Sequence, residues 1–300
     1  MLNFKVVTDT SCNFTKEEID KNGLIIIPLS IQLDKEVFKE KEDSRYDMVT
    51  LAYKINSEKL LPKVINPSVD EFFKIYSSIY PRHGSILSIH TSSGITDVIE
   101  RAKNTQFLLY DANINLIDLP LVEVGLKPLI IKACNMVAND KSSIPVLIST
   151  LYTLSSRFFT FIISDNLNFV LANTNFRGKK PPIFSLNEEK YRYIFSVSGG
   201  KLYFIGRCPM NQVIDSITRV METVVKENKI YIKFLYSLDK EFTMTLSEVI
   251  NSKFDAETIG LEEMSLSSMC RFGTHSIFVG FSFDEEFFAK NLPTQENIQE

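Results

Sequence analysis

Short apolar runs alternate with amphipathic stretches through the first half of the chain. Apolar runs rich in β-branched residues predict strands, and apolar residues three and four positions apart predict helices. The predicted strands cover residues 4–9, 24–29, 31–33, 84–90, 106–110 and 158–163. One helix is predicted to begin at each of the capping boxes at Thr15 and Ser68, and another to end near residue 56. Further helices are predicted over 97–104, from Pro128 to 139 and over 144–155. Residues 35–44 are predicted to form a charged loop. This alternation predicts an α/β fold, a parallel sheet with helices on both faces.

The pattern changes near residue 165. Gly199 and Gly200 separate two strand-like runs over 191–197 and 201–207, which is typical of a hairpin. The other predicted elements are helices over 211–228 and 245–252 and strands over 230–236, 264–270 and 276–283. We therefore expect two domains, an N-terminal α/β domain over residues 1–164 and a C-terminal α+β domain over residues 165–300.

The composition excludes several classes of function. The 300 residues are 44% hydrophobic and carry a net charge of −4, whereas a nucleic-acid interface requires positive charge. No apolar run reaches the roughly 18 residues of a membrane span, and the N-terminus enters a strand without a signal-peptide pattern, so we expect a cytoplasmic protein. The 4 cysteines form no CxxC pair and only 3 histidines are present, so we predict no metal site and no cofactor.

The segment over residues 85–96 predicts a ligand site. A buried strand ends there in a loop of small hydroxylated residues, and a helix follows. The free N–H groups of a helix N-terminus and the hydroxyl donors then point into the crevice beyond the carboxyl ends of the strands, where open α/β sheets bind ligands. The predicted ligand therefore carries oxygen atoms and is not a metal ion.

Four segments of the chain, in this order, resemble the DegV family, which includes the fatty-acid-carrying subunits of bacterial fatty acid kinases. They are residues 5–11 with 25–29, Asn66-Pro-Ser68 before a helix, the double-serine loop over 88–93, and Gly273-Thr-His275 before the last strand. The resemblance implies two domains with one fatty acid buried in a tunnel between them. It also implies a lipid carrier that has no catalytic residues and presents the acyl carboxylate to a separate kinase subunit.

The resemblance implies a lipid head-group site as well, and this chain departs from the family pattern there. The family's carboxylate-binding threonine corresponds to Val64, its serine to Thr96, and the glycine after that serine to Asp97. Ser93 and His275 remain as further head-group candidates. Asp97 places a negative charge beside the site, and two like charges about 4 Å apart repel by about 4 kcal/mol at an effective dielectric near 20. We therefore expect an altered site that prefers a neutral or protonated head group.

On the surface that the resemblance assigns to the kinase, the family's arginine corresponds to Asn175, and Arg177 lies close by in the sequence. We expect this chain to be a poor carrier for a standard fatty acid kinase. Two alternatives stay open: a ligand-free regulatory or interaction protein on the same fold, and an α/β enzyme acting on a small phosphorylated metabolite. Ser92 and Ser93 lie in no GxSxG elbow, which disfavours a hydrolase.

Overall fold

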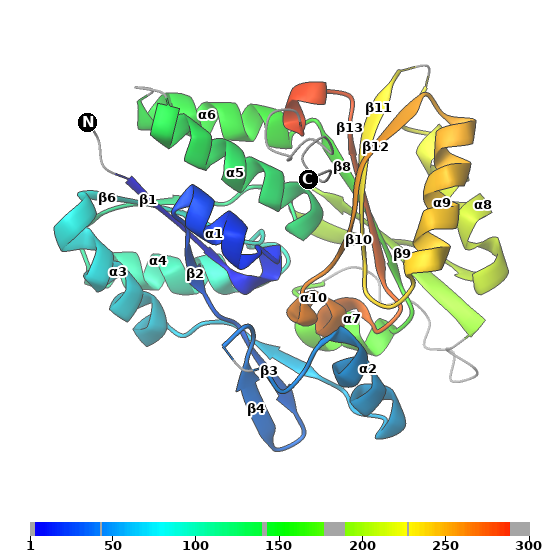
Figure 1. Ribbon diagram of the computed structural model, residues 1–300, viewed down its shortest axis with the longest axis horizontal. Helices are drawn as coiled ribbons and strands as arrows, with labels where there is room; N and C mark the ends of the chain where they lie inside the picture. Colours follow the sequence, from blue (N-terminus) through cyan, green and yellow to red (C-terminus); the bar gives the residue numbers. More distant parts are fainter. Residues whose placement is uncertain (1–3, 43, 140–142, 177–189, 227, 289–300) are drawn as a thin grey trace, which may run out of the picture.

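The chain forms three sheets with helices packed around them (Figure 1). The computed structural model describes residues 4–42, 44–139, 143–176, 190–226 and 228–288. The first sheet is parallel throughout and has the strand order β2-β1-β6-β7. Its strands are β1 (Phe4–Asp9), β2 (Ile25–Ile27), β6 (Ser85–Ile89) and β7 (Asn113–Ile117).

Alternate side chains of the parallel sheet enter two different cores. Val7 and Ile86 pack in one core with residues of α3 and α4, whereas Val6 and Leu87 pack in another with residues of α5 and α6. The helices of this half are α1 (Lys16–Asn22), α3 (Val69–His83), α4 (Val98–Leu108), α5 (Glu123–Asn139) and α6 (Ile144–Ser155). A parallel sheet with helices on both faces is therefore confirmed.

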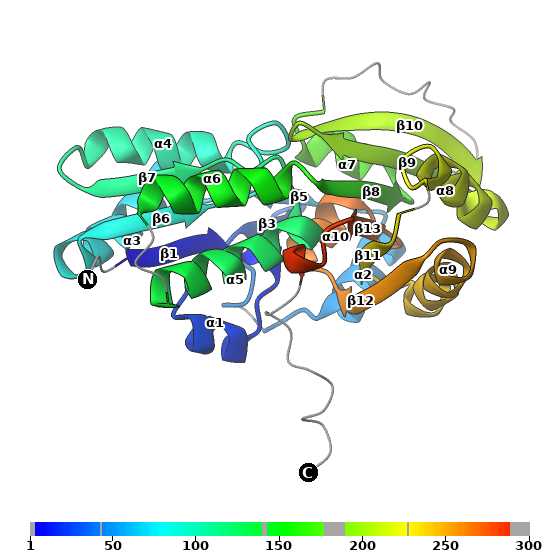
Figure 2. The ribbon, with the colours of Figure 1, turned by 90° about the horizontal axis from the view of Figure 1, so that it is seen from above.

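The second sheet has six strands in the order β10-β9-β8-β13-β11-β12, and only β11 and β12 pair in parallel. Its strands are β8 (Phe158–Ser164), β9 (Tyr191–Ser198), β10 (Lys201–Pro209), β11 (Ile230–Tyr236), β12 (Ala256–Glu263) and β13 (Ile277–Ser282). Helices α8 (Val213–Glu222) and α9 (Lys240–Lys253) cover one of its faces (Figure 2). The domain boundary after residue 164 stays a prediction, but by sheet membership β8 lies with the second half.

A third, smaller sheet is antiparallel and has the order β4-β3-β5. Its strands are β3 (Ser30–Leu33), β4 (Glu36–Lys39) and β5 (Lys63–Ile65), and α2 (Met48–Ser57) lies between β4 and β5 in the sequence. Two short helices, α7 (Leu167–Asn173) and α10 (Leu266–Phe272), pack on each other. Since α10 also contacts β3, β5, β8 and the Thr10–Cys12 turn after β1, it lies where the three sheets meet.

Three predicted elements are wrong because local apolar or charged composition was misleading. α4 covers residues 106–108 of the predicted strand 106–110, and Phe107 and Leu108 are exposed there, so their apolar character does not reflect burial in a sheet. The predicted loop over 35–44 contains β4, which pairs with β3 across a turn at Asp34. The predicted strand over 264–270 is mainly α10, whose Ser265 caps the helix by accepting from the Ser268 N–H at 3.0 Å.

The bounds of several predicted helices also differ. α5 begins at Glu123, so Pro128 lies in the second turn of the helix and not in the first. α8 ends at Glu222, several residues before the predicted end at 228. Among the described residues, none of the helices combines the length and the apolar character that crossing a membrane requires.

Candidate functional site

The carboxyl ends of β1 and β6 lie next to each other because the two strands are neighbours in the parallel sheet. β1 continues into the turn Thr10–Cys12, and β6 continues into the hydroxyl-rich loop. The hydroxyls of Ser11 and Thr91 lie 3.1 Å apart, and both side chains are buried. The structure thus brings two hydroxyl-bearing loops together where the sequence predicts the ligand crevice.

A chain of hydrogen-bonded side chains begins at these strand ends. Asp9 Oδ2 lies 2.6 Å from His90 Nδ1, and His90 Nε2 lies 2.8 Å from Ser88 Oγ. Ser88 Oγ in turn lies 2.7 Å from the Tyr76 hydroxyl. Burial opposes the ionisation of Asp9, but hydrogen bonds from His90 and Ser11 outweigh it and hold the pKa of Asp9 below its usual value.

Ser88, His90 and Asp9 lie at the distances of a hydrolase triad, but these side chains are not accessible to a substrate. Ser88 and His90 are fully buried, and the ring of Phe72 packs edge-on against the imidazole at 5.3 Å between centroids. Ser88 is also held by Tyr76. A nucleophile must reach its substrate, and here the core would have to open first. We interpret this chain of side chains as a structural network.

Thr96 is buried, and its hydroxyl has no hydrogen-bond partner among the described residues. Its N–H donates to the Ser92 carbonyl at 3.1 Å, and Asp97 takes the N-cap position of α4. A buried hydroxyl without a partner costs about 1–3 kcal/mol. The Thr96 hydroxyl therefore has no partner within the described residues, and its contact with a ligand stays a prediction.

Ser93 and Asn175 lie together on the outer side of the double-serine loop. Ser93 is exposed, and both its N–H and its hydroxyl donate to the carboxylate of Asp118. The Asn175 N–H donates to the Ile95 carbonyl at 2.8 Å, and Asn175 Nδ2 donates to the Ser93 carbonyl at 3.2 Å. The polar groups of Ser93 are therefore bonded to Asp118 and not to Thr96. Arg177 lies outside the described residues.

Asp97 is bonded from two directions. Its Oδ1 accepts from Asn66 Nδ2, and its Oδ2 accepts from Arg101 Nε at 2.9 Å and Nη2 at 2.8 Å. Partial burial opposes ionisation, yet the hydrogen bonds from Arg101 and Asn66 outweigh it and hold the pKa of Asp97 below its usual value. Asp97 therefore carries its own counterion, which reduces the repulsion that the sequence predicts for a ligand carboxylate.

Asn66 also joins Asp97 to a buried arginine that sequence reasoning did not identify. Arg271 Nη2 donates to Asn66 Oδ1 at 2.7 Å, and the residue is 2% exposed. Arg271 Nε is buried and has no partner among the described residues. The sequence contains one signal for it, because Arg271 is the single charged residue in the apolar segment 269–272. Burying a charge costs free energy unless the charge is paired.

Buried acidic groups surround the charge of Arg271 as well. Asp9, Glu40 and Glu123 all act electrostatically on its guanidinium. Glu40 accepts the N–H of Ser267 in the first turn of α10, and Glu123 accepts that of the N-cap residue Ser265, at 3.0 Å in both cases. Burial raises the pKa of Glu40, and it raises the pKa of Glu123 to about 8. A cluster of buried charged and acidic side chains therefore lies around α10, next to apolar residues of the main core.

Val64 lies in β5, two residues before Asn66 in the sequence. Its N–H donates to Asn173 Oδ1 at 2.7 Å, and its side chain packs in the main hydrophobic core. An apolar side chain offers no donor to a ligand oxygen, so Val64 contributes shape alone.

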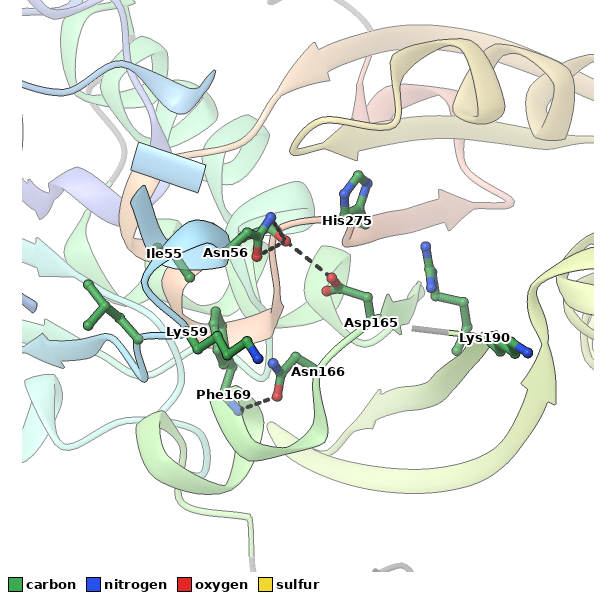
Figure 3. A pocket seen from close by; sticks show the side chains of 11 residues that line it. Ile55, Asn56, Lys59, Asp165, Asn166, Phe169, Lys190 and His275 are labelled. Carbon is green, nitrogen blue, oxygen red and sulfur yellow. Dashed lines mark hydrogen bonds between the residues drawn. The ribbon is translucent and has the colours of Figure 1, made fainter. Parts of the chain in front are cut away.

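His275 lies in a different place. It lines a cleft of about 700 Å³ together with Asn56, Lys59 and Asp165, and Figure 3 shows these side chains around the opening. His275 Nδ1 lies 2.6 Å from Asp239 Oδ1, and this hydrogen bond raises the pKa of His275 against the effect of partial burial. None of the other predicted head-group residues lines this cleft. The structure therefore does not bring His275 together with them.

The described part of the chain holds no group of three or more His, Cys, Asp or Glu side chains that is placed to bind a metal ion. The cysteines, Cys12, Cys134, Cys208 and Cys270, are buried and free.

Sequence comparison places the chain among known proteins. A family model described as an uncharacterised protein of the DegV family matches residues 3–284. A DegV domain-containing protein of Streptococcus pneumoniae is 26% identical over 144 residues, which are 47% of this chain and 50% of that relative, so the match spans about half of its length. A DegV domain-containing protein of Staphylococcus aureus is 22% identical over 84% of this chain and 88% of its own length.

Solved structures share the fold. A DegV family protein from Thermus thermophilus, described by its fatty acid binding, has a TM-score of 0.79 at 17% identity and covers 93% of this chain and 99% of its own. The Fatty Acid Kinase B3 protein of Streptococcus pneumoniae, loaded with linoleic acid, has a TM-score of 0.74 at 15% identity over 94% and 100% of the two chains. The predicted two-part α/β architecture is confirmed by these likenesses. Because the family model matches nearly the whole sequence, this chain belongs to the DegV family.

Proposed function

We propose that this chain binds one long-chain fatty acid or a related lipid between its two halves and acts as a carrier without catalytic activity of its own. The observation that carries the proposal is the fold, which over 93% of the chain is similar to that of a protein described by its fatty acid binding. A sixteen-carbon chain buried at about 0.8 kcal/mol per methylene contributes on the order of 10 kcal/mol before the costs of binding. That gain is enough to retain a lipid through purification.

The head group of this lipid lies beside Thr96 at the carboxyl ends of β1 and β6. The buried hydroxyl without a partner supports this position. Asp97 follows Thr96 in the sequence and accepts a hydrogen bond from Asn66, which lies two residues after Val64. Ser93 and His275 have a smaller part in the proposal, since Ser93 is bonded to Asp118 and His275 lines the separate cleft.

Native mass spectrometry of the chain, purified from its expression host and afterwards offered palmitate, tests the proposal. We expect one lipid molecule per chain, either carried from the host or taken up from solution. An empty chain that takes up no palmitate contradicts the proposal and favours a ligand-free regulatory or interaction protein. A bound phosphorylated compound contradicts it too and favours an enzyme on a small phosphorylated metabolite.

A fatty acid kinase is the proposed partner, with Asn175 on the surface that meets it. The likeness to the Fatty Acid Kinase B3 protein supports the class of partner. An arginine at the centre of an interface commonly contributes about 2 kcal/mol or more, a factor of about 30. Reconstitution with a standard kinase, ATP and palmitate is expected to give little acyl phosphate, and Asn175→Arg to raise the rate. Rapid turnover by the wild-type chain would contradict this and point to Arg177 as a substitute.

A further inference from the structure

The cleft that His275 lines is separate from the proposed lipid head-group site and has the size of a small-molecule site. Its volume is about 700 Å³, and ligand sites usually have about 300–1,000 Å³. Figure 3 shows Asn56 and Lys59 on the side of α2, with Asp165 and His275 opposite them. Neither Thr96 nor Asp97 lines this cleft. Its lining residues therefore need an explanation of their own.

The acidic groups at the cleft already have cations beside them. Asp239 Oδ1 lies 2.6 Å from His275 Nδ1, and Asp239 Oδ2 lies 3.8 Å from Arg192 Nη2. Asp165 Oδ2 accepts from the Thr274 hydroxyl at 3.2 Å, and the charges of Arg192 and His275 act on Asp165 as well. Asp165 Oδ1 is buried over the Cα of the glycine before Thr274. Arg192 and a protonated His275 thus balance the two carboxylates.

Two further cations at the cleft are left without a counterion. Lys59 and Lys190 line it and are exposed, and neither forms an ion pair within the described residues. His275 adds a donor, because Nδ1 is bonded to Asp239 and only Nε2 remains for a ligand. The same hydrogen bond raises the pKa of His275, which favours the protonated ring whose Nε2 donates. These groups together favour an anion.

The backbone of Lys59 supports a role for its side chain. α2 ends in a turn in which the Leu60 N–H donates to the Ile55 carbonyl at 2.9 Å, and Lys59 has a φ of 53° there. Glycine is the usual residue at this position after a helix, because it adopts positive φ without strain. A lysine in this conformation costs free energy, and such residues are common at ligand sites. Lys59 is therefore retained for more than the turn.

We propose that the cleft binds a phosphate monoester of a small organic molecule, with Lys59, Lys190 and His275 donating to the phosphate oxygens. A phosphate monoester carries about −1.5 to −2 charges at neutral pH, which matches two unpaired lysines better than a single carboxylate does. The organic part then packs on the apolar residues of the lining, which are Ile55, Leu60 and Phe169. The inference goes beyond the proposed function, because it adds a second ligand beside the lipid.

Phenyl phosphate is a suitable probe, since it carries a phosphate monoester on an apolar ring. It is added at constant pH and ionic strength to the chain loaded with palmitate, and NMR follows the His275 ring signals, assigned with His275→Gln. We expect a saturable shift with a Kd below about 1 mM. Benzoate keeps the ring and has a single charge, so we expect it to bind about 10-fold more weakly. Phenol is expected to cause no saturable shift.

Lys59→Gly separates the charge from the fold. The variant loses the ammonium group and gains the residue that the turn favours, so it should be at least as stable as the wild type. We expect its affinity for phenyl phosphate to fall by about 10-fold, as for the loss of one hydrogen bond to a charged group. Asp34→Gly is the matched control, because it relaxes another positive φ in the turn between β3 and β4, outside the cleft. It should bind phenyl phosphate as the wild type does.

The outcomes keep this inference distinct from the proposed function. The inference is overturned if phenyl phosphate causes no saturable shift, if phenol binds equally well, or if Lys59→Gly binds like the wild type. Release of palmitate by phenyl phosphate, measured by native mass spectrometry, would place the cleft in the lipid site and overturn it as well. If the chain loads no palmitate, the proposed function is wrong, and the same titration of the unloaded chain still tests the cleft. A phosphorylated compound bound beside a lipid agrees with both proposals, whereas one bound in place of a lipid contradicts the proposed function.

Discussion

Two histidine–aspartate pairs in this molecule have the same length and different surroundings. In each pair, Nδ1 lies 2.6 Å from a carboxylate oxygen, His90 with Asp9 and His275 with Asp239. His90 is fully buried and its Nε2 is bonded to Ser88, whereas the His275 side chain is 38% exposed and borders a cleft. Distance alone does not distinguish the pairs. The burial of His90 and the hydrogen bond of its Nε2 indicate that the His90–Asp9 pair stabilises the core, whereas the His275–Asp239 pair faces solvent.

Removing each imidazole should separate the two pairs most clearly. His90→Ala leaves Asp9 buried without its partner and a cavity beside Phe72, so we expect a loss of about 3–5 kcal/mol in the free energy of unfolding. His275→Ala removes a partly exposed pair and should cost about 1 kcal/mol or less. Urea unfolding of both variants checks this. Equal losses would show that the two pairs hold the fold alike.

A buried acid without a histidine sharpens the comparison. Burial outweighs the hydrogen bonds to Glu123 and raises its pKa to about 8, whereas His90 lowers that of Asp9. A raised pKa means that the folded state binds the proton more tightly than the unfolded state. The stability from Glu123 is therefore complete below its ordinary pKa of 4.5 and is lost as the pH rises through about 8.

The stability of the wild-type chain should accordingly fall between about pH 6 and about pH 8, by up to about 1.4 kcal/mol per pH unit. Glu123→Gln keeps the hydrogen bond of the protonated acid and removes the titration, so its stability should change little over the same interval. Urea unfolding at several pH values provides the measurement. Parallel curves for the two proteins would mean that Glu123 titrates normally in the folded state.

The end of the buried network offers a smaller test. Tyr76→Phe removes the hydroxyl that lies 2.7 Å from Ser88 Oγ and keeps the ring. Ser88 retains its contact with His90, so we expect a loss of about 1 kcal/mol in the free energy of unfolding. Tyr53→Phe, at an exposed position of α2, is a suitable control and should change nothing. A loss above that of His90→Ala would show that the network depends on the phenol and not on the imidazole.

The smallest expected effect is the titration of His275. Its hydrogen bond to Asp239 raises its pKa above 6.5, so the stability from this pair is complete below pH 6.5 and is lost as the pH rises through the folded-state value. Since the side chain is 38% exposed, solvent screening limits the contribution to a few tenths of a kcal/mol, about the lower end for exposed pairs. An NMR titration should show Asp239→Asn lowering the His275 pKa. An unchanged His275 pKa would show that Asp239 does not stabilise the protonated imidazole.

Several elements were predictable because their signals are local. Thr15 and Ser68 form capping boxes as predicted, since both partners of each box lie within three residues. Gly199 and Gly200 adopt positive φ in the turn between β9 and β10, and strand β11 has the predicted bounds. Where apolar side chains stay exposed, as in Phe107, the same local rules failed because composition cannot show which face is buried.

The polar contacts of the site depend on residues that are far apart in the sequence, so they could not be predicted in the same way. Asp9 and His90 are 81 positions apart, and Arg271 and Asn66 are 205 positions apart. The sequence around Arg271 predicted a strand, and only the packing of α10 shows that this cation is buried. The position of Thr96 followed from a family resemblance, and its role in binding stays a prediction.

The position of β13 in the six-stranded sheet has a consequence for the order in which the chain folds. β13 lies between β8 and β11, although nearly all of the second half of the sequence separates it from β8. During synthesis, β8, β9 and β10 can pair as they leave the ribosome, and β11 can pair with β12. These two groups of strands remain unjoined until β13 emerges and inserts between them, a late step of long loop closure. Because β13 also contacts α5, this insertion adds contacts between the completed sheet and the first half of the chain.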